Sequence, residues 1–142
     1  MVILASDHAG FNLKNKLKNW LYKKHIDFVD VGAKILDNED SYVEYAKKAM
    51  DLMKEEPLKK AILICGSGVG MCIVANRSKN VRAVIGTSKK IVKQAVAHNN
   101  ANALCIGARN TSFSTAKGFV KIFLNSTFLS GKYLKRIDSI DE

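Results

Sequence analysis

Three apolar runs of the chain lead into residues that can do chemistry. One run ends at the segment 65–70, which reads Cys-Gly-Ser-Gly-Val-Gly, another precedes the pair Asp7 and His8, and a third ends shortly before Arg109. If the runs are parallel strands of one sheet, these groups converge outside the carboxyl ends of the strands, where open α/β sheets bind ligands. The sequence therefore predicts a ligand site at this edge.

The glycine-rich segment is suited to binding an anion. Glycines at 66, 68 and 70, between a buried strand and a helix, let backbone N–H groups point at one spot at a helix N-terminus, which favours negative charge. The segment is not a dinucleotide fingerprint, because the position three after Gly68 is Met71, and the Gly-Lys-Ser of a P-loop is absent. A purely structural glycine turn is the alternative.

The thiol of Cys65 is the sharper signal, because a cysteine at a helix N-terminus is partly thiolate. Nucleophilic roles fit poorly. A Cys-x5-Arg loop would need arginine where Met71 stands, and a nucleophile elbow would need glycines where Leu63 and Ser67 stand. A thiolate beside an anion hole instead suits proton abstraction next to a carbonyl, with the N–H groups stabilising an enediolate.

Two histidines and one aspartate complete the candidate set. His8 is a candidate for phosphate binding and His98 for acid-base work, although each can instead be a surface or hydrogen-bonded structural residue. Asp7 can be the N-cap of the helix that follows it or a carboxylate of the site. The sequence leaves these alternatives open.

Strands and helices that alternate along the chain must position these groups. The predicted strands are 2–5, 28–31, 61–64, 81–85 and 103–106, and segments of helical period lie between them. Since right-handed crossovers place helices on both faces of a parallel sheet, the pattern predicts a Rossmann-like, doubly wound, five-stranded α/β fold. We expect one domain over 1–142, with residues 131–142 as a helical tail.

Apolar stripes indicate which helix faces pack on the sheet, and all of them are interpreted as core. The stripe at 116–123 follows the fifth strand, and a short helix from about Gly70 follows the third strand. The stripes are Leu13, Leu17, Trp20 and Leu21; Tyr42, Tyr45, Ala46, Ala49, Met50 and Met53; Ile91, Val92, Ala95 and Val96; and Ala116, Phe119, Val120 and Phe123.

Composition narrows the class of protein. The net charge of +10 admits an anionic partner, but the lysines are spread over predicted helix faces without a nucleic-acid motif, which is typical of a solvated surface. Three cysteines form no C-x-x-C pair, and Cys72 and Cys105 are interpreted as small buried hydrophobes. No run is long enough to span a membrane and no leader is recognised, so we expect a cytoplasmic protein without nucleic-acid or membrane partners.

Four linked motifs resemble type B ribose-5-phosphate isomerases, and the resemblance covers the whole chain in order. The motifs are Asp7-His8-Ala9-Gly10, Ile64-Cys65-Gly66-Ser67-Gly68-Val69-Gly70, His98-Asn99-Asn100-Ala101-Asn102 and Gly131-Lys132-Tyr133-Leu134-Lys135-Arg136. The resemblance implies a Rossmann-type homodimer, possibly paired into a dimer of dimers, that acts in the pentose phosphate pathway. It would interconvert ribose 5-phosphate and ribulose 5-phosphate through an enediol, without metal or cofactor.

The resemblance also assigns roles to residues. It gives Cys65 the role of the base and His98, aided by Asp7, that of opening the furanose ring, and Ser67 keeps a hydroxyl where the family often has threonine. The enediolate hole would comprise Gly66, Gly68, Val69 and Gly70. The sugar and phosphate contacts would be His8, Asn99, Arg109, Lys132 and Arg136.

Two departures from the family pattern lie near these residues. Lys132 stands where the family has arginine, so a bidentate phosphate contact becomes a point charge. Asn100 stands where aspartate is common, with an effect that the sequence leaves open.

Two rival functions remain. One is a hexose-phosphate isomerase acting on allose or galactose 6-phosphate. The related galactose-6-phosphate isomerases divide the cysteine and the His-Asn-Asn stretch between unlike subunits, whereas this chain has both, which favours a self-sufficient homodimer. The other rival is a non-catalytic sugar-phosphate binder on the same fold. It is disfavoured because it would need neither a thiol nor an acid partner.

The predicted topology separates the two main catalytic candidates. Cys65 follows the third strand at the carboxyl edge of the sheet, while His98 ends a helix that runs back to the opposite edge, just before the fifth strand. A strand of five or six residues spans roughly 17–20 Å, too far for both side chains to meet one sugar. The sequence therefore predicts active sites shared between two chains.

Overall fold

The protein has the predicted alternation of strands and helices. A computed structural model describes residues 1–56 and 58–142. The elements are β1 (Val2–Ser6), α1 (Phe11–Lys23), β2 (Phe28–Asp30), α2 (Tyr42–Glu55), β3 (Lys60–Cys65), α3 (Val69–Ala75), β4 (Ala83–Ile85), α4 (Lys89–Asn99), β5 (Ala103–Gly107), α5 (Phe113–Asn125), the 3-10 turn η1 (Gly131–Tyr133) and α6 (Leu134–Asp138). The predicted fold class is confirmed.

Within the described residues, five strands form one parallel sheet in the order β2-β1-β3-β5-β4. The three central strands are continuous apolar runs because both of their faces are covered. Their register places Ser6 beside Ile64, and Cys65 beside Gly107. The carboxyl ends of β1, β3 and β5 therefore lie side by side.

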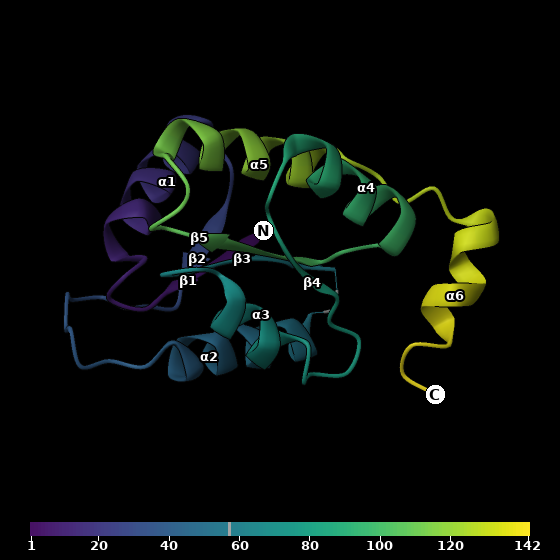
Figure 1. The fold of residues 1–142 in the computed structure, drawn as a ribbon, viewed down its shortest axis with the longest axis horizontal. Coiled ribbons are helices and arrows are strands. Elements are labelled where there is room, and N and C mark those ends of the chain that lie inside the picture. Colours follow the sequence, from purple (N-terminus) through teal and green to yellow (C-terminus); the bar gives the residue numbers. More distant parts are fainter. Residues whose placement is uncertain (57) are drawn as a thin grey trace.

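Helices cover both faces of the sheet (Figure 1). On one face α1, α4 and α5 pack through apolar residues such as Leu17, Val92 and Phe123. On the other face α2 and α3 bury Met50 and Met71 against the same strands. The sheet is thus the middle layer of three, and its strand ends are what the connecting loops expose.

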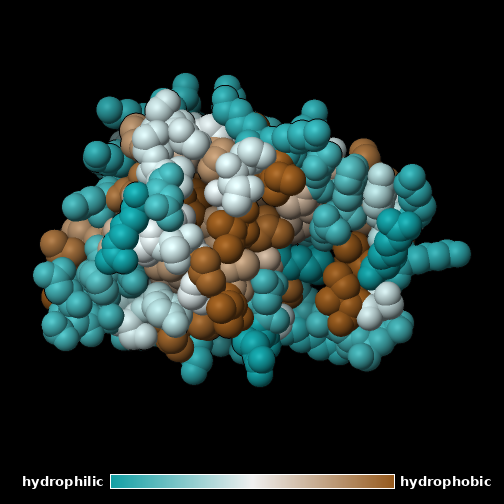
Figure 2. Space-filling view, in the orientation of Figure 1, coloured by the Kyte–Doolittle hydropathy of each residue, from teal (hydrophilic) through white to brown (hydrophobic). Residues whose placement is uncertain are grey.

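The tail leaves this body. Figure 1 shows α6 standing off beyond β4 and the end of α4, and the backbone N–H of Asn80 donates to Asp141 at 2.8 Å. Figure 2 shows apolar side chains gathered on the edge that carries β4 and on α6, with a hollow between. Exposed apolar residues include Ile73 of α3, which packs beside β4, Leu134 of α6 and Ile140 just after α6. No helix among the described residues has the length and hydrophobicity to cross a membrane.

Two residues of the predicted core stripes are not core. Tyr42 is 39% exposed and Ile91 is 46% exposed. Each lies in the first turn of its helix, α2 or α4, and the buried residues of both helices begin after it, at Ala46 and Val92. Trp20 of α1 packs against the core but is half-buried rather than enclosed.

Candidate active site

The loop after β1 is bound to the end of β3. The backbone N–H of Asp7 donates to the carbonyl of Ile64 at 3.3 Å. A Cβ at Gly10 would lie 2.5 Å from that same carbonyl oxygen, so only glycine allows this approach. The start of α1 is therefore held against the strand that ends in Cys65.

Cys65 is the last residue of β3 and is 4% exposed. Its carbonyl accepts the N–H of Ala108 at 2.8 Å, and the carbonyl of Gly66 accepts the N–H of Arg109 at 3.0 Å. The backbone on both sides of the thiol is thus tied to the loop after β5. A thiol held in this way can meet a substrate atom without a loop having to order first.

The segment after Cys65 turns sharply into α3. Gly68 has a φ of 81°, and a Cβ there would lie 3.1 Å from the backbone nitrogen of Gly107. The hydroxyl of Ser67 accepts the N–H of Val69 at 3.3 Å, which closes the turn. The first-turn N–H groups of a helix lack carbonyl partners within it, and here they begin directly beside the thiol.

Two larger side chains cover this segment. The guanidinium of Arg109 lies against Gly66, where a Cβ would be 2.7 Å from Nη1. The ring of Tyr42 lies equally close to Gly70, at 2.7 Å from the corresponding position. Arg109 was predicted from its place after β5, whereas Tyr42 was assigned to the core and is instead a wall of the site.

His8 is held by a residue that the sequence reasoning missed. Oδ1 of Asp40 accepts the backbone N–H of His8 at 3.0 Å and lies 2.7 Å from its ring Nδ1. This hydrogen bond raises the pKa of His8 above its ordinary value. Asp40 lies 32 residues from His8, in the long polar loop before α2, and that loop was the one signal that could have drawn attention to it.

Asp7 and Asp40 place two carboxylates next to this imidazole. Oδ1 of Asp7 accepts the N–H of Gly10 at 3.2 Å, and Gly10, not Asp7, is the N-cap of α1. Candidate ligand atoms of Asp7, His8 and Asp40 lie within 4.8 Å of one another, so among the described residues this trio has the spacing to hold a metal ion. Its hydrogen bonds equally suit acid-base work or the binding of a phosphate.

The remaining predicted residues lie elsewhere in the chain. His98 and Asn99 end α4, and the ring of His98 stacks on Tyr133 of the tail at 4.7 Å between centroids and 8° between planes. This stacking joins His98 to the part of the chain that carries Lys132 and Arg136. Asn100 caps α4 with a φ of 49°, a left-handed conformation that asparagine tolerates.

These residues lie at the amino edge of the sheet, because β5 begins a few residues after His98. Ala103 is level with Ala61, whereas Cys65 is level with Gly107. At about 3.3 Å per residue, the four residues between these levels span about 13 Å along the strand. The chain thus assembles two separate sets of predicted site residues, one at each edge.

The other two cysteines, Cys72 and Cys105, lie in α3 and β5. Cys105 is fully buried in β5, and Cys72 of α3 is half-buried beside it. A hydrogen bond from the Cys105 thiol lowers the pKa of Cys72 to about 7, and that bond and burial raise the pKa of Cys105. Cys72 is therefore a thiol with thiolate character, a feature that the sequence reasoning did not anticipate.

Comparison with known proteins gives a consistent result. The model of the family described as Ribose/Galactose Isomerase matches residues 2–140. A probable ribose-5-phosphate isomerase B of Mycoplasma genitalium is 38% identical over 140 residues, which are 98% of this chain and 92% of that protein. A D-erythrulose-4-phosphate isomerase of Mycolicibacterium smegmatis is 34% identical over 129 residues, which are 89% of this chain and 85% of that protein.

Solved structures share the fold over the same length. The crystal structure of ribose-5-phosphate isomerase B from Mycoplasma genitalium, with bound ribulose 5-phosphate, superposes with a TM-score of 0.94 at 37% identity. The match covers 98% of this chain and 92% of that one.

Proposed function

The chain belongs to the ribose/galactose isomerase family, and from this premise we propose that it interconverts ribose 5-phosphate and ribulose 5-phosphate. The observation that carries the proposal is the grouping of chemically suitable residues at the carboxyl edge of the sheet. There the thiol of Cys65 lies directly before the first turn of α3, beside Arg109 and the pair Asp7 and His8. These groups supply a base, an anion hole and cations for a phosphorylated sugar.

In the proposed reaction Cys65 acts as a thiolate base on the open-chain aldose. It removes the proton from C2, the C–H electron pair forms a C1–C2 double bond, and the carbonyl oxygen on C1 becomes the enediolate oxygen. Backbone N–H groups from Gly66 to Gly70 stabilise that oxygen. The proton returns to C1 as the double bond moves to the oxygen on C2, and the loss of that hydroxyl proton to the C1 oxygen yields the ketose.

Ring opening and phosphate binding require further groups. We assign ring opening to His98, with Asp7 as its aid, and the sugar and phosphate contacts to His8, Asn99, Arg109, Lys132 and Arg136. Lysine in place of arginine at 132 gives a single charge rather than a two-pronged contact, so Arg136 and Arg109 would supply the bidentate contacts.

Since the set around Cys65 and the set around His98 lie at opposite edges, we further propose that a second copy of the chain completes each site. A two-fold dimer brings the amino-edge set of one copy to the carboxyl-edge set of the other. Exposed apolar residues support such an interface. Among them are Ile73 of α3 and Ile91 of α4, the helices that flank the edge strand β4, and Leu134 of the tail.

Turnover of defined substrates tests the reaction. Purified protein should convert ribose 5-phosphate with a kcat/KM at least about tenfold above those for allose 6-phosphate, galactose 6-phosphate and erythrulose 4-phosphate, as expected where one sugar fits the site better. Preference for a six-carbon sugar would make the chain a hexose-phosphate isomerase. Binding without turnover of any of the four would make it a sugar-phosphate binder.

Mixing two inactive variants tests the shared site. After subunit exchange between Cys65→Ala and His98→Ala proteins, half of the dimers are mixed and each has one intact site, so about a quarter of wild-type activity should return from two-fold symmetry. Exchange is followed with two affinity tags, and the parent variants alone are the control. Proven exchange without recovery of activity would place the whole site within one chain.

A further inference from the structure

The helical layer of α1, α4 and α5 carries charge of one sign. The structure describes every residue of these helices: α1 has four lysines, α4 has three and α5 has two, and none of the three has an aspartate or glutamate. Lys14 and Lys18 pair with Asp30, but the other lysines have no such partner within the layer. By contrast α2 mixes both signs and forms the pairs Lys48–Glu44 and Lys54–Asp51.

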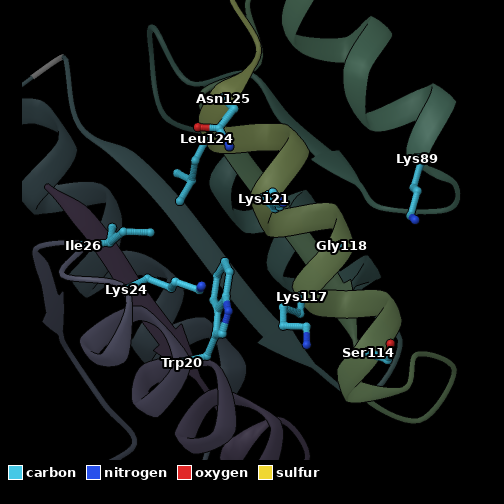
Figure 3. A pocket seen from close by; sticks show the side chains of 10 residues that line it. All are labelled: Trp20, Lys24, Ile26, Lys89, Ser114, Lys117, Gly118, Lys121, Leu124 and Asn125. Carbon is cyan, nitrogen blue, oxygen red and sulfur yellow. The ribbon is translucent and has the colours of Figure 1, made fainter.

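A hollow of about 600 Å³ opens in this layer (Figure 3). Trp20 and Lys24, from the end of α1, lie on one side of α5, and Lys89, from the start of α4, lies on the other. Lys117 and Lys121 of α5 complete a set of four amines around it. Among residues 1–56 and 58–142, no acidic side chain lines the hollow or forms an ion pair with these four lysines.

Gly118 shapes the hollow where it passes over α5. A Cβ at this position would lie 3.1 Å from Cε of Lys89 and 3.9 Å from its Nζ. Glycine within a helix destabilises it relative to alanine, yet here its missing side chain gives Lys89 room to lie across the helix. Lys89 is thereby brought to the same hollow as the lysines of α5.

The hollow also has an apolar end, formed by Trp20, Ile26 and Leu124. An indole beside aliphatic groups suits a flat aromatic ring, and the amines suit several negative charges on one ligand. Its volume is that of a small-molecule site rather than of a surface for a polymer. We propose that this hollow binds a nucleoside triphosphate, with the base at Trp20 and the phosphates among Lys24, Lys117 and Lys121.

The site is separate from the proposed catalytic one. No lining residue belongs to either set of catalytic candidates, and the lining comes from α1, α4, α5 and the segments next to them rather than from the loops after β1 and β3. Substrate and nucleotide would therefore bind at the same time.

The chain offers a direct probe, because Trp20 is its single tryptophan. ATP should quench the fluorescence of Trp20 in a saturable way, and equilibrium dialysis with labelled ATP should give the same affinity. Tripolyphosphate, which lacks the base, and adenosine, which lacks the charge, should each bind at least about tenfold more weakly, since each loses one half of the contacts. Saturating ribose 5-phosphate should leave ATP binding unchanged.

Charge reversal supplies matched variants. Lys121→Glu should weaken ATP binding by about tenfold or more, because it removes a charged contact and adds a repulsion. Lys16→Glu, an exposed lysine of α1 outside the hollow, should change affinity by less than about threefold, as expected for a distant screened charge. Circular dichroism and isomerase turnover verify that both variants fold.

Three outcomes would overturn the proposal. Equal weakening by both variants would mean a general lysine field rather than a site. Displacement of ATP by ribose 5-phosphate in simple competition would place ATP in the catalytic site. Binding of an RNA oligonucleotide with none of ATP would make the layer a surface for nucleic acid.

Discussion

The carboxylates of two aspartates, Asp30 at the end of β2 and Asp40 in the loop before α2, have different hydrogen-bond partners. Both oxygens of Asp30, at the end of β2, are bound: Oδ1 accepts from Lys14 at 2.7 Å and from the N–H of Gly32 at 3.0 Å, and Oδ2 accepts from Lys18 at 3.1 Å. At Asp40, Oδ1 serves His8, while the buried Oδ2 has no hydrogen-bond partner among the described residues.

We interpret Asp30 as a structural residue and Asp40 as a residue of the candidate site. Burial opposes ionisation of Asp30, but its hydrogen bonds outweigh that cost and hold the pKa of the carboxyl below its usual value. A fully satisfied network of this kind rigidifies a fold, whereas a buried polar group that is only half satisfied is common where a protein does chemistry. The comparison predicts that changes around Asp30 alter stability and that changes around Asp40 and Cys65 alter activity.

The largest effect should follow from Cys65→Ala. Because general-base catalysis contributes roughly 10²- to 10⁴-fold and no other base is assigned beside the substrate, turnover should fall at least by that range. Exchange of the C2 proton with solvent should vanish too, while the melting temperature stays near that of the wild type. Cys72→Ala is the matched control and should keep its activity. A Cys65→Ala protein with more than about a tenth of wild-type turnover lies outside that range, and Cys65 would not be the base.

Lys14→Ala should lower the stability of the fold instead. Lys14 is fully buried and also donates to the carbonyl of Ala33 at 2.6 Å, so its removal leaves Asp30 with one partner fewer. Breaking a buried ion pair typically costs about 3–5 kcal/mol, measured here as the free energy of unfolding in urea. Lys16→Ala, on the same helix but exposed, should cost less than about 0.5 kcal/mol. Loss of turnover in folded Lys14→Ala protein at unchanged stability would remove the distinction between the two carboxylates.

Asp40→Asn should have a smaller effect, on activity. The hydrogen bond from His8 is weaker to an amide than to a carboxylate, so kcat/KM should fall by about tenfold, as expected for one charge-assisted hydrogen bond. Stability should hardly change.

The pH dependence sharpens this prediction. Since Asp40 raises the pKa of His8 above 6.5, the charged imidazole persists to higher pH in the wild type, and KM should rise only as the pH passes that raised value. In Asp40→Asn this rise should move to lower pH. Identical KM profiles for the two proteins would mean that Asp40 does not act through His8.

The fold was predictable because its signals are local. Apolar runs of strand length and stripes of helical period each arise within a few residues, so the order and type of the elements follow from the sequence. The turn at Gly68 and the place of Cys65 at a strand end could also be predicted, since both depend on neighbours in the chain.

The missed features are those that depend on distant contacts. Asp40 meets His8 across 32 residues, and the exposed loop around it has no periodicity that fixes its path. Tyr42 fits the apolar stripe of α2 by spacing, and only the end of the sheet decides that it covers Gly70 instead. The hydrogen bond between Cys72 and Cys105 depends on how α3 packs over β5, which no local pattern records.

Removal of metal ions should have no effect on activity, and this prediction tests the role of Asp40 in the candidate site. Asp7, His8 and Asp40 have the spacing of metal ligands, so a metal ion is the rival explanation for the idle oxygen of Asp40. Nδ1 of His8 lies 2.7 Å from Oδ1 of Asp40, and Oδ1 of Asp7 accepts from the N–H of Gly10, so these atoms already have partners within the protein. The proposed enediol route needs only proton transfers.

Activity should therefore survive exhaustive treatment with EDTA, measured before and after dialysis with and without added Mg²⁺, Mn²⁺ or Zn²⁺. Asp40 would instead be a metal ligand if EDTA removed the activity, one of these ions restored it, and the same ion failed to restore activity in Asp40→Asn.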